Sequence, residues 1–365
     1  MIRLSKPIIG KAEEKEMLKV LKSGYLSSGS YVKRFEEKFS SYLGVKFSVA
    51  TSSGTTALDV ALKAAGVNKG SYVLTTPFSF IATSNAILYQ GAIPVFADID
   101  PLTFNLSPEG IEEKIKKNRK IKTLLLVHLF GLPCDMAGIK KIVNRFNLTL
   151  IEDCAQAVGA EFSGRKVGTF GKASTFSFYA TKNITSGEGG MVVCNNKHLK
   201  DRFSLFINHG SMQKNVHPQL GYNYRLTNLA AALGLCQLKK IKEFNKKRIR
   251  NAGVLSRAFQ KIDWLIPPRV PEGHKHVFHQ YTIRLKKGVR RDYFIKHLKG
   301  RKIEAGVFYP YPIYQQPLYR REGYGELFLP NVERISREVV SLPVHPGLNQ
   351  GDLKTIIEAV LNFRV

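Results

Sequence analysis

Short apolar runs alternate with helix-like segments over the first two-thirds of the chain. Most runs are continuously apolar or β-branched, which is typical of strands covered on both faces. They predict strands at 47–50, 72–75, 94–97, 123–127, 148–151, 175–178 and 191–194. The segments between them predict helices at 55–65, 84–89, 108–117, 136–146 and 199–206. The alternation predicts an α/β fold with a mostly parallel sheet wrapped in helices, and a ligand site beyond the carboxyl ends of its strands.

The pattern changes after a basic segment near residue 250. Residues 276–285 predict a strand with alternating burial, and residues 291–298 and 350–362 predict helices. An aromatic and proline-rich stretch lies between them at 307–318. We therefore predict a large domain over residues 1–245 and a smaller α+β C-terminal domain over residues 246–365.

The composition is that of a globular protein, with 44% hydrophobic and 23% charged residues among 365. No apolar run reaches the roughly 18 residues of a membrane span, and residues 1–15 lack the apolar core of a signal peptide. We therefore expect a cytoplasmic protein with no membrane partner. The cysteines form no C-x-x-C pair, which argues against a metal or redox site; they are Cys134, Cys154, Cys194 and Cys236.

The net charge of +28, from 56 Lys and Arg against 28 Asp and Glu, is the unusual feature of the composition. Such a charge suits nucleic acid, an acidic membrane surface or phosphorylated ligands. The densest basic stretch, 239–250, includes Arg248 and has apolar residues at helical spacing, so it predicts the solvent-exposed face of an amphipathic helix. No RNP, zinc-finger or basic-zipper pattern supports a nucleic-acid partner.

Three segments carry candidate chemistry. Residues 52–56, Ser-Ser-Gly-Thr-Thr, follow a strand and open a helix whose free N–H groups can hold a phosphate or can simply be capped. Asp153 ends an apolar strand, where it needs a cationic partner or caps the next helix. Lys182 lies in a turn ahead of a glycine-rich segment, 187–190, and can be a Schiff-base nucleophile or a surface lysine. Together they are the parts that a pyridoxal 5′-phosphate site requires.

Further motifs follow one another in a characteristic order along the chain. They are residues 23–29, 53–58, 76–80, 98–101, 127–131, 152–156, 181–183, 221–228 (Gly-Tyr-Asn-Tyr-Arg-Leu-Thr-Asn) and 341–346 (Ser-Leu-Pro-Val-His-Pro). With these motifs the chain resembles, over essentially its whole length, the sugar-nucleotide aminotransferases of the DegT/DnrJ/EryC1/StrS family. The resemblance implies an aspartate aminotransferase-like (fold type I) structure with a seven-stranded sheet.

The resemblance also implies a role for individual residues. Lys182 would be the Schiff-base lysine, and Asp153 the acid paired with the pyridine nitrogen of the cofactor. Phe80 would stack on the cofactor ring and Gln156 would lie against its opposite side. The implied phosphate ligands are Gly54, Thr55 and Ser177.

Further implied residues concern the neighbouring subunit and the substrate. Asn223 would reach the phosphate from the neighbouring subunit, which implies a homodimer with shared active sites. Arg225 and Tyr309 would contact the sugar nucleotide. The sequence departs from the family at Phe308, where His is frequent before Tyr309, and at Leu132, where Gln is common. Packing by Phe308 and a sugar contact by Tyr309 are both open.

The implied function is transamination of a 3-keto or 4-keto group on a nucleotide-linked sugar, with glutamate as amino donor, for amino-sugar, surface-polysaccharide or secondary-metabolite biosynthesis. One alternative is an aminotransferase acting on a cyclitol ketone. A sugar dehydratase using the same cofactor is another, although that subset of the family carries His in place of Lys182. A basic nucleic-acid-binding or regulatory protein is the non-enzymatic alternative, which the intact Lys182, Asp153 and Ser177 disfavour.

Overall fold

A seven-stranded sheet forms the centre of the computed structural model, which describes residues 1–211 and 213–364. Its strand order is β1-β9-β8-β5-β4-β2-β3, and β9 is the strand that runs antiparallel to its neighbours. The strands are β1 Phe47–Thr51, β2 Tyr72–Thr75, β3 Ile93–Phe96, β4 Ile121–Val127, β5 Thr149–Asp153, β8 Ala173–Ser177 and β9 Gly190–Cys194. The predicted α/β fold and its seven strands are therefore confirmed.

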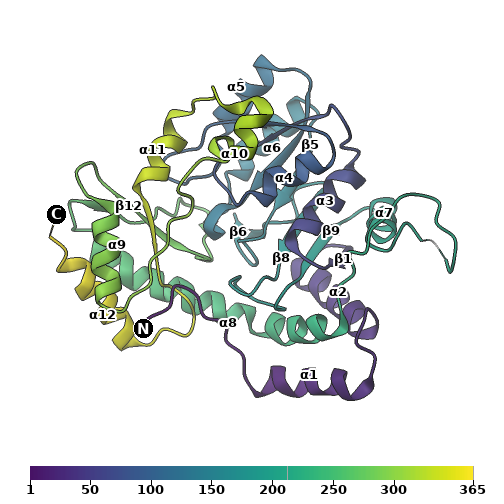
Figure 1. Ribbon diagram of the computed structural model, residues 1–365, viewed down its shortest axis with the longest axis horizontal. Helices are drawn as coiled ribbons and strands as arrows, with labels where there is room; N and C mark the ends of the chain where they lie inside the picture. Colours follow the sequence, from purple (N-terminus) through teal and green to yellow (C-terminus); the bar gives the residue numbers. More distant parts are fainter. Residues whose placement is uncertain (212, 365) are drawn as a thin grey trace.

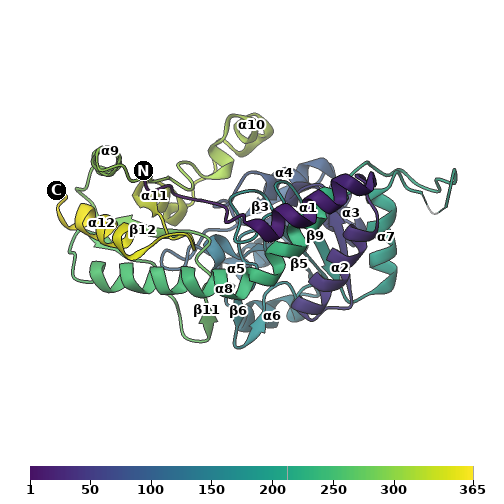
Figure 2. The ribbon, with the colours of Figure 1, turned by 90° about the horizontal axis from the view of Figure 1, so that it is seen from below.

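Helices cover both faces of this sheet (Figures 1 and 2). One face packs against α3 (Gly54–Ala65), α4 (Ala82–Tyr89) and α7 (Lys197–Ile207). The other face packs against α2 (Ser30–Leu43), α5 (Pro108–Lys117), α6 (Met136–Arg145) and α8 (Asn228–Phe259). The sequence patterns did not predict α2 or α1 (Lys11–Ser23). Helix α1 lies along α8, and an ion pair between the buried Glu13 of α1 and Lys240 of α8 joins the two helices.

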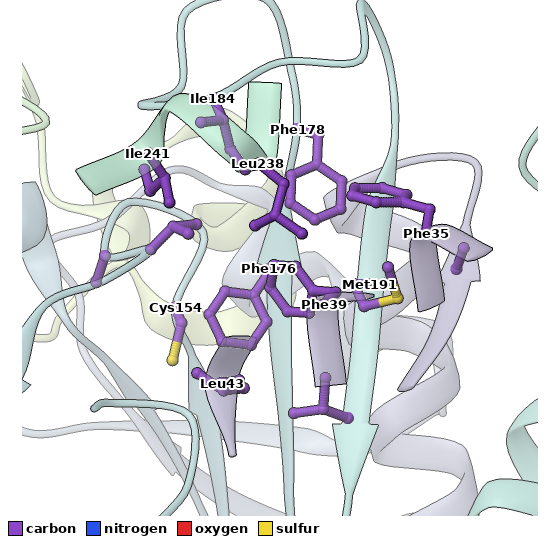
Figure 3. Close-up of a cluster of buried hydrophobic side chains, with 14 of the residues drawn as sticks. Phe35, Phe39, Leu43, Cys154, Phe176, Phe178, Ile184, Met191, Leu238 and Ile241 are labelled. Atoms are coloured by element: carbon purple, nitrogen blue, oxygen red, sulfur yellow. The ribbon is translucent and has the colours of Figure 1, made fainter. Parts of the chain in front are cut away.

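An aromatic cluster fixes the sheet to α2 and α8 (Figure 3). Phe35 and Phe39 of α2 meet Phe176 and Phe178 from the end of β8, with Phe39 and Phe176 ring centroids 4.9 Å apart. All four side chains are fully buried. This packing holds the carboxyl end of β8, which leads into the turn of Lys182, against two helices.

Strand β5 shows how the sheet directs one acid toward each face. Leu150 packs against α5 and α6, whereas Ile151 packs against the α3 side. Since side chains alternate between the two faces of a strand, Glu152 points to the same face as Leu150, and Asp153 points to the same face as Ile151. Asp153 therefore points toward α3 and α4, at the carboxyl end of the strand.

A smaller unit is built on a second sheet, β10-β12-β13, with α9 and α12 packed against it. Its elements are β10 Leu265–Ile266, β12 Tyr281–Leu285, β13 Val339–Leu342, α9 Arg291–Gly300 and α12 Gln350–Leu361. A third sheet joins β6 (Glu161–Phe162) and β7 (Arg165–Lys166) to β11 (His274–Lys275).

The predicted strand over residues 276–285 is wrong in its first half. Only the part from Tyr281 onward is β12. Before it, the Val277 and Gln280 N–H groups donate to carbonyls of Gly131 and Phe130, at 3.0 and 3.3 Å. The segment bonds to the loop after β4 instead of extending the small sheet, and this brings residues 279 and 280 to the edge of the large sheet.

Helix α8 connects the two units without interruption (Figure 2). Ile241 and Phe244 belong to the core of the large sheet, whereas Leu255 and Phe259 belong to the core of the small one. The predicted domain boundary, between residues 245 and 246, falls inside this helix and stays a prediction.

The basic residues of α8 mostly face solvent, but the reading of Arg248 as a solvated residue is wrong. Its side chain is 4% exposed, and Nη1 donates to the carbonyls of Phe278 and His279 at 3.1 and 3.2 Å. Burial lowers the pKa of Arg248 to about 10. Helical spacing predicts which face of the helix a residue occupies, but it does not show that carbonyl groups of a distant segment accept hydrogen bonds from Nη1 of this arginine, while its Nε is buried without a partner.

The aromatic and proline-rich stretch returns to the large sheet. It contains η2 (Ile313–Gln315), α10 (Pro317–Tyr319) and η3 (Arg320–Tyr324), and is followed by α11 (Pro330–Glu338). Tyr314 and Tyr319 pack on Phe96 of β3, with ring centroids 6.2 and 6.0 Å away.

A short turn, η1 (Leu129–Gly131), follows β4. Among the described residues, no helix combines the length and the apolar character needed to cross a bilayer.

Candidate active site

A cavity of about 620 Å³ opens at the carboxyl ends of β5 and β8, beside the first turns of α3 and α4. Its position is the one predicted for the ligand of a parallel sheet. Eight of the residues proposed from the sequence line it: Gly54, Thr55, Phe80, Asp153, Gln156, Ser177, Lys182 and Tyr309.

The first turn of α3 forms a polar cradle on one side of the cavity. Ser53 caps the helix by accepting a hydrogen bond from the Thr56 N–H at 3.1 Å. The N–H groups of Gly54 and Thr55 precede the first intrahelical bonds, so they are free to bind an anion beside the positive end of the helix dipole. A Cβ on Gly54 would lie 2.7 Å from the Ser177 Cβ, so the close approach of α3 to β8 requires glycine.

Asp153 faces this cavity from the end of β5 and is 4% exposed. Its Oδ1 accepts a hydrogen bond from the Ala155 N–H at 3.0 Å, and its Oδ2 accepts one from the Thr83 hydroxyl at 2.9 Å. Burial raises the pKa of Asp153, while these two hydrogen bonds and the positive charge of Lys182 oppose the rise. Each carboxylate oxygen can accept a further hydrogen bond, so Asp153, which lines the cavity, can bind a donor placed there.

Lys182 lies in the turn between β8 and β9. The turn is closed by a hydrogen bond from the Lys182 N–H to the Tyr179 carbonyl at 2.9 Å. Burial lowers the pKa of the side chain to about 8, and the charge of Asp153 partly opposes that shift. A substantial fraction of the amine is therefore neutral near physiological pH, as a nucleophile or proton carrier must be. The cationic neighbour expected for Asp153 is this lysine, although no direct hydrogen bond joins the two side chains.

Gln156 and Tyr309 form a second wall. The Phe130 N–H donates to Gln156 Oε1 at 2.8 Å, so the amide nitrogen points to the Tyr309 hydroxyl, 3.2 Å away. The Tyr309 oxygen accepts this bond and its proton remains available to the cavity. Phe308 also lines the cavity, and Phe80 is 57% exposed at its mouth.

The structure does not bring Asn223 and Arg225 into this cavity. They lie in the segment between α7 and α8, and neither is among the residues that line the cavity. Asn223 is exposed and pairs with Asn208 in an isolated bridge. Arg225 Nη1 donates to Asn208 Oδ1 at 2.7 Å. Both residues are therefore held on a loop outside the site of their own chain.

Several cavity residues were missed by the sequence analysis. Two of them are Thr83, in the first turn of α4, and Ser79, in the loop before it. The sequence shows them only as two hydroxyl residues four positions apart, which does not indicate a binding site. His279 enters because residues 276–280 leave the small sheet; its Nδ1 lies 3.3 Å from Asn183 Oδ1. Burial, with Lys182 and other cations nearby, holds the pKa of His279 well below its usual value. Ser5 gave no signal, since the N-terminal segment reaches the cavity through tertiary contacts alone.

The sequence matches the DegT/DnrJ/EryC1/StrS aminotransferase family over residues 7–361. The chain belongs to this family. It is 37% identical to the GDP-perosamine synthase of Escherichia coli O157:H7 over 368 residues, which cover 99% of this chain and 98% of that protein. The resemblance stated from the motifs is thereby confirmed.

Solved structures agree with this membership of the DegT/DnrJ/EryC1/StrS family. The fold superposes on Helicobacter pylori PseC, an aminotransferase of pseudaminic acid biosynthesis, with a TM-score of 0.94 and 32% identity, covering 98% of this chain and 97% of that one. It also superposes on NtdA from Bacillus subtilis, whose structure contains the cofactor PMP, with a TM-score of 0.89 and 31% identity, covering 97% of this chain and 82% of that one. The aspartate aminotransferase-like fold is confirmed.

The cavity fits the cofactor of this family, pyridoxal 5′-phosphate. The cradle of Gly54, Thr55 and Ser177 offers hydrogen-bond donors and the end of a helix dipole to a phosphate group. Asp153 offers free carboxylate lone pairs to a protonated ring nitrogen, and Lys182 offers a partly neutral amine. The protein is an aminotransferase that uses this cofactor, and the residues that line the cavity fit its phosphate, its ring nitrogen and its aldehyde.

Proposed function

We propose that this aminotransferase transfers an amino group from glutamate to a 3-keto or 4-keto group of a nucleotide-linked sugar. The observation that carries the proposal is the meeting of Lys182, Asp153 and the α3 cradle in one cavity of about 620 Å³. That volume lies within the range of small-molecule sites and leaves room for a sugar beside a cofactor. The GDP-sugar enzyme among its relatives supports a nucleotide-linked substrate.

Each residue has a proposed task in the reaction. When bound, pyridoxal 5′-phosphate supplies an electron sink for the charge that develops at the substrate carbon. Asp153 would accept a hydrogen bond from the protonated ring nitrogen and so stabilise its positive charge. Lys182 Nζ would take the proton from the amino-bearing carbon of glutamate in the first half-reaction and deliver a proton to the sugar carbon that receives the nitrogen in the second, because a tethered amine with a pKa of about 8 is close and partly neutral.

The remaining predicted residues bind and orient. Gly54, Thr55 and Ser177 would hold the phosphate, and Phe80, at the mouth of the cavity, would stack on the ring. Gln156, which the Phe130 N–H orients and which donates a hydrogen bond to the Tyr309 hydroxyl, would contact the other side of the ring. Tyr309 can then donate its free proton to an oxygen of the sugar.

We further propose a homodimer with shared active sites. Four large apolar side chains of α1 and the turn after it are exposed, at 53%, 52%, 79% and 43% for Leu18, Leu21, Tyr25 and Leu26. The 221–228 motif ends at this surface, since Asn228 Nδ2 donates to the Tyr25 carbonyl at 2.9 Å. A second copy that covers the apolar surface would meet the loop of Asn223 and Arg225, where Asn223 can reach the partner's phosphate and Arg225 its nucleotide.

The proposal places this dimer in the cytoplasm, where nucleotide sugars and glutamate are both available. It keeps the division into a large cofactor-binding domain and a smaller C-terminal domain, with the cavity walled by residues of both. Leu342, at the end of β13, and Val344, two residues beyond it, line the cavity together with the α3 cradle. Closure of one unit on the other would exclude water from the site.

The experiment is a two-step assay with purified protein loaded with pyridoxal 5′-phosphate. Glutamate alone is expected to convert the bound cofactor to its amino form, seen as loss of the visible absorbance band. Addition of GDP-, UDP- or dTDP-linked 3-keto or 4-keto sugars is expected to restore the band and give an aminated sugar by mass spectrometry, with Lys182→Ala as inactive control. Restoration by a cyclitol ketone alone, or release of a dehydrated sugar, would contradict the proposal.

A further inference from the structure

Thr83, in the first turn of α4, makes a buried hydrogen bond to Asp153 across 70 residues of sequence. Thr83 Oγ1 lies 2.9 Å from Asp153 Oδ2, and the two residues are 1% and 4% exposed. An ionised carboxylate has no proton to give, so the threonine hydroxyl must be the donor. Its single proton is therefore committed to Asp153.

The direction of this bond orders a second hydroxyl. Ser79 Oγ lies 3.0 Å from Thr83 Oγ1, and either could donate when the pair is considered alone. Because the Thr83 proton points to Asp153, Ser79 must donate to Thr83. The two hydroxyls form a short chain polarised toward the carboxylate, and such chains strengthen the terminal bond.

Asp153 has few other restraints among the residues that the structure describes. The Ala155 N–H holds Oδ1, and Thr83 makes the one side-chain hydrogen bond to the carboxylate. A single bond to Oδ1 leaves the carboxylate free to turn about its Cβ–Cγ bond, whereas bonds to both oxygens fix its plane. Lys182 and His128 act on the carboxylate through charge, and Asp153 in turn helps to raise the pKa of Tyr309, which stays neutral.

We propose that Thr83 is a positioning residue, whose hydroxyl fixes the plane of the Asp153 carboxylate and favours its charged form, so that its free lone pairs point at the ring nitrogen of the cofactor. The inference rests on the role proposed above for Asp153. The direction of the effect follows from the sign of each contribution: burial raises the pKa of Asp153 and the Thr83 bond lowers it. Loss of the hydroxyl therefore moves protonation of Asp153 to higher pH.

The test compares Thr83→Val, which replaces the hydroxyl with a methyl group, with Thr83→Ser, which keeps it. The readout is the affinity of the apoprotein for pyridoxamine 5′-phosphate, measured by calorimetry from acid to neutral pH. Thr83→Val is expected to weaken binding about tenfold and to move the acid loss of affinity to higher pH, and Thr83→Ser to recover most of both. Thr282→Val is the matched control, because it removes a hydroxyl from a residue of the small sheet that is only 2% exposed and is hydrogen-bonded to Ser341.

Asp153→Asn separates the possible failures. In that background Thr83→Val is expected to add nothing, since the two residues act as one unit. If Asp153→Asn weakens binding while Thr83→Val behaves like Thr282→Val, the positioning role is wrong and the proposed function stands. If Asp153→Asn itself binds like the parent with an unchanged pH dependence, the role of Asp153 fails, and the inference about Thr83 fails with it.

Discussion

Glu152 and Asp153 are consecutive residues of β5, yet their carboxylates lie on opposite faces of the sheet in opposite chemical settings. Glu152 is fully buried and accepts hydrogen bonds at 2.7–3.1 Å from the N–H groups of Gly168, Phe170 and Gly171, the Ser174 hydroxyl and His128 Nε2. Burial alone would raise its pKa, but His128 and these N–H groups outweigh it, so the pKa is lowered. Asp153 accepts two such bonds and its pKa is raised.

This contrast predicts that the two acids fail in different ways when neutralised. Glu152→Gln places an amide nitrogen among donors and leaves buried groups unpaired, so we expect a loss of roughly 2–4 kcal/mol in the free energy of unfolding of the apoprotein. Asp153→Asn is expected to unfold like the parent but to lose about 10³-fold in turnover rate. Urea unfolding and steady-state rates measure the two effects. Near-normal turnover by Asp153→Asn would show that this acid is structural.

The depressed pKa of Lys182 gives a pH prediction. Because burial lowers it to about 8, the rate at which the apoprotein captures pyridoxal 5′-phosphate covalently should rise with pH and level off above about 8. Asp153 raises this pKa, so Asp153→Asn should move the midpoint to lower pH. Stopped-flow absorbance gives both midpoints. A midpoint near the usual lysine value in the parent protein would contradict the desolvated site.

The close approach of α3 to β8 predicts a steric effect at Gly54. Gly54→Ala puts a methyl group 2.7 Å from the Ser177 Cβ, so the cradle must widen and the affinity for pyridoxamine 5′-phosphate should fall by about tenfold or more. Gly300→Ala is the matched control, since a Cβ there meets nothing within 4 Å. Calorimetric titration of both apoproteins checks the prediction, which fails if the two variants bind alike.

The shared-site dimer predicts complementation between two impaired chains. Lys182→Ala and Asn223→Ala chains, mixed and allowed to exchange, should form mixed dimers with one site that carries both lesions and one that carries neither. Random exchange would leave about a quarter of all sites intact, so activity should exceed that of either parent.

The outcome is informative when Asn223→Ala alone is clearly impaired and subunit exchange is followed by native mass spectrometry. If Asn223 serves the cavity of its own chain, every site in a mixed dimer keeps one lesion and mixing restores nothing. Elution of the fully active protein at monomer mass would also refute the shared site.

Local patterns were sufficient to predict the large sheet. Most of its strands are runs of apolar or β-branched residues because both faces are covered, and such runs are visible in a single sequence. The end of β5 at Asp153 and the opening of α3 at Gly54 were predictable for the same reason, since each lies where a periodic pattern stops. The resemblance to the family then supplied roles that no pattern carries.

What could not be predicted depends on contacts between distant segments. Arg248 has the spacing and charge of a solvated residue, and only the fold shows the carbonyls of residues 278 and 279 that receive it. Residues 276–280 have the composition of a strand, but they bond to the loop after β4. Thr83 is one hydroxyl among many until α4 is placed beside β5.

The most direct test of the proposed active site is to locate the lysine that holds the cofactor. The protein, saturated with pyridoxal 5′-phosphate, is reduced with borohydride, digested and mapped by mass spectrometry. We expect a single pyridoxyl label on Lys182, and none in Lys182→Ala despite an unchanged fold by circular dichroism. Stoichiometric label on another lysine, or no label after saturation, would contradict the assignment of this cavity as the site of transamination.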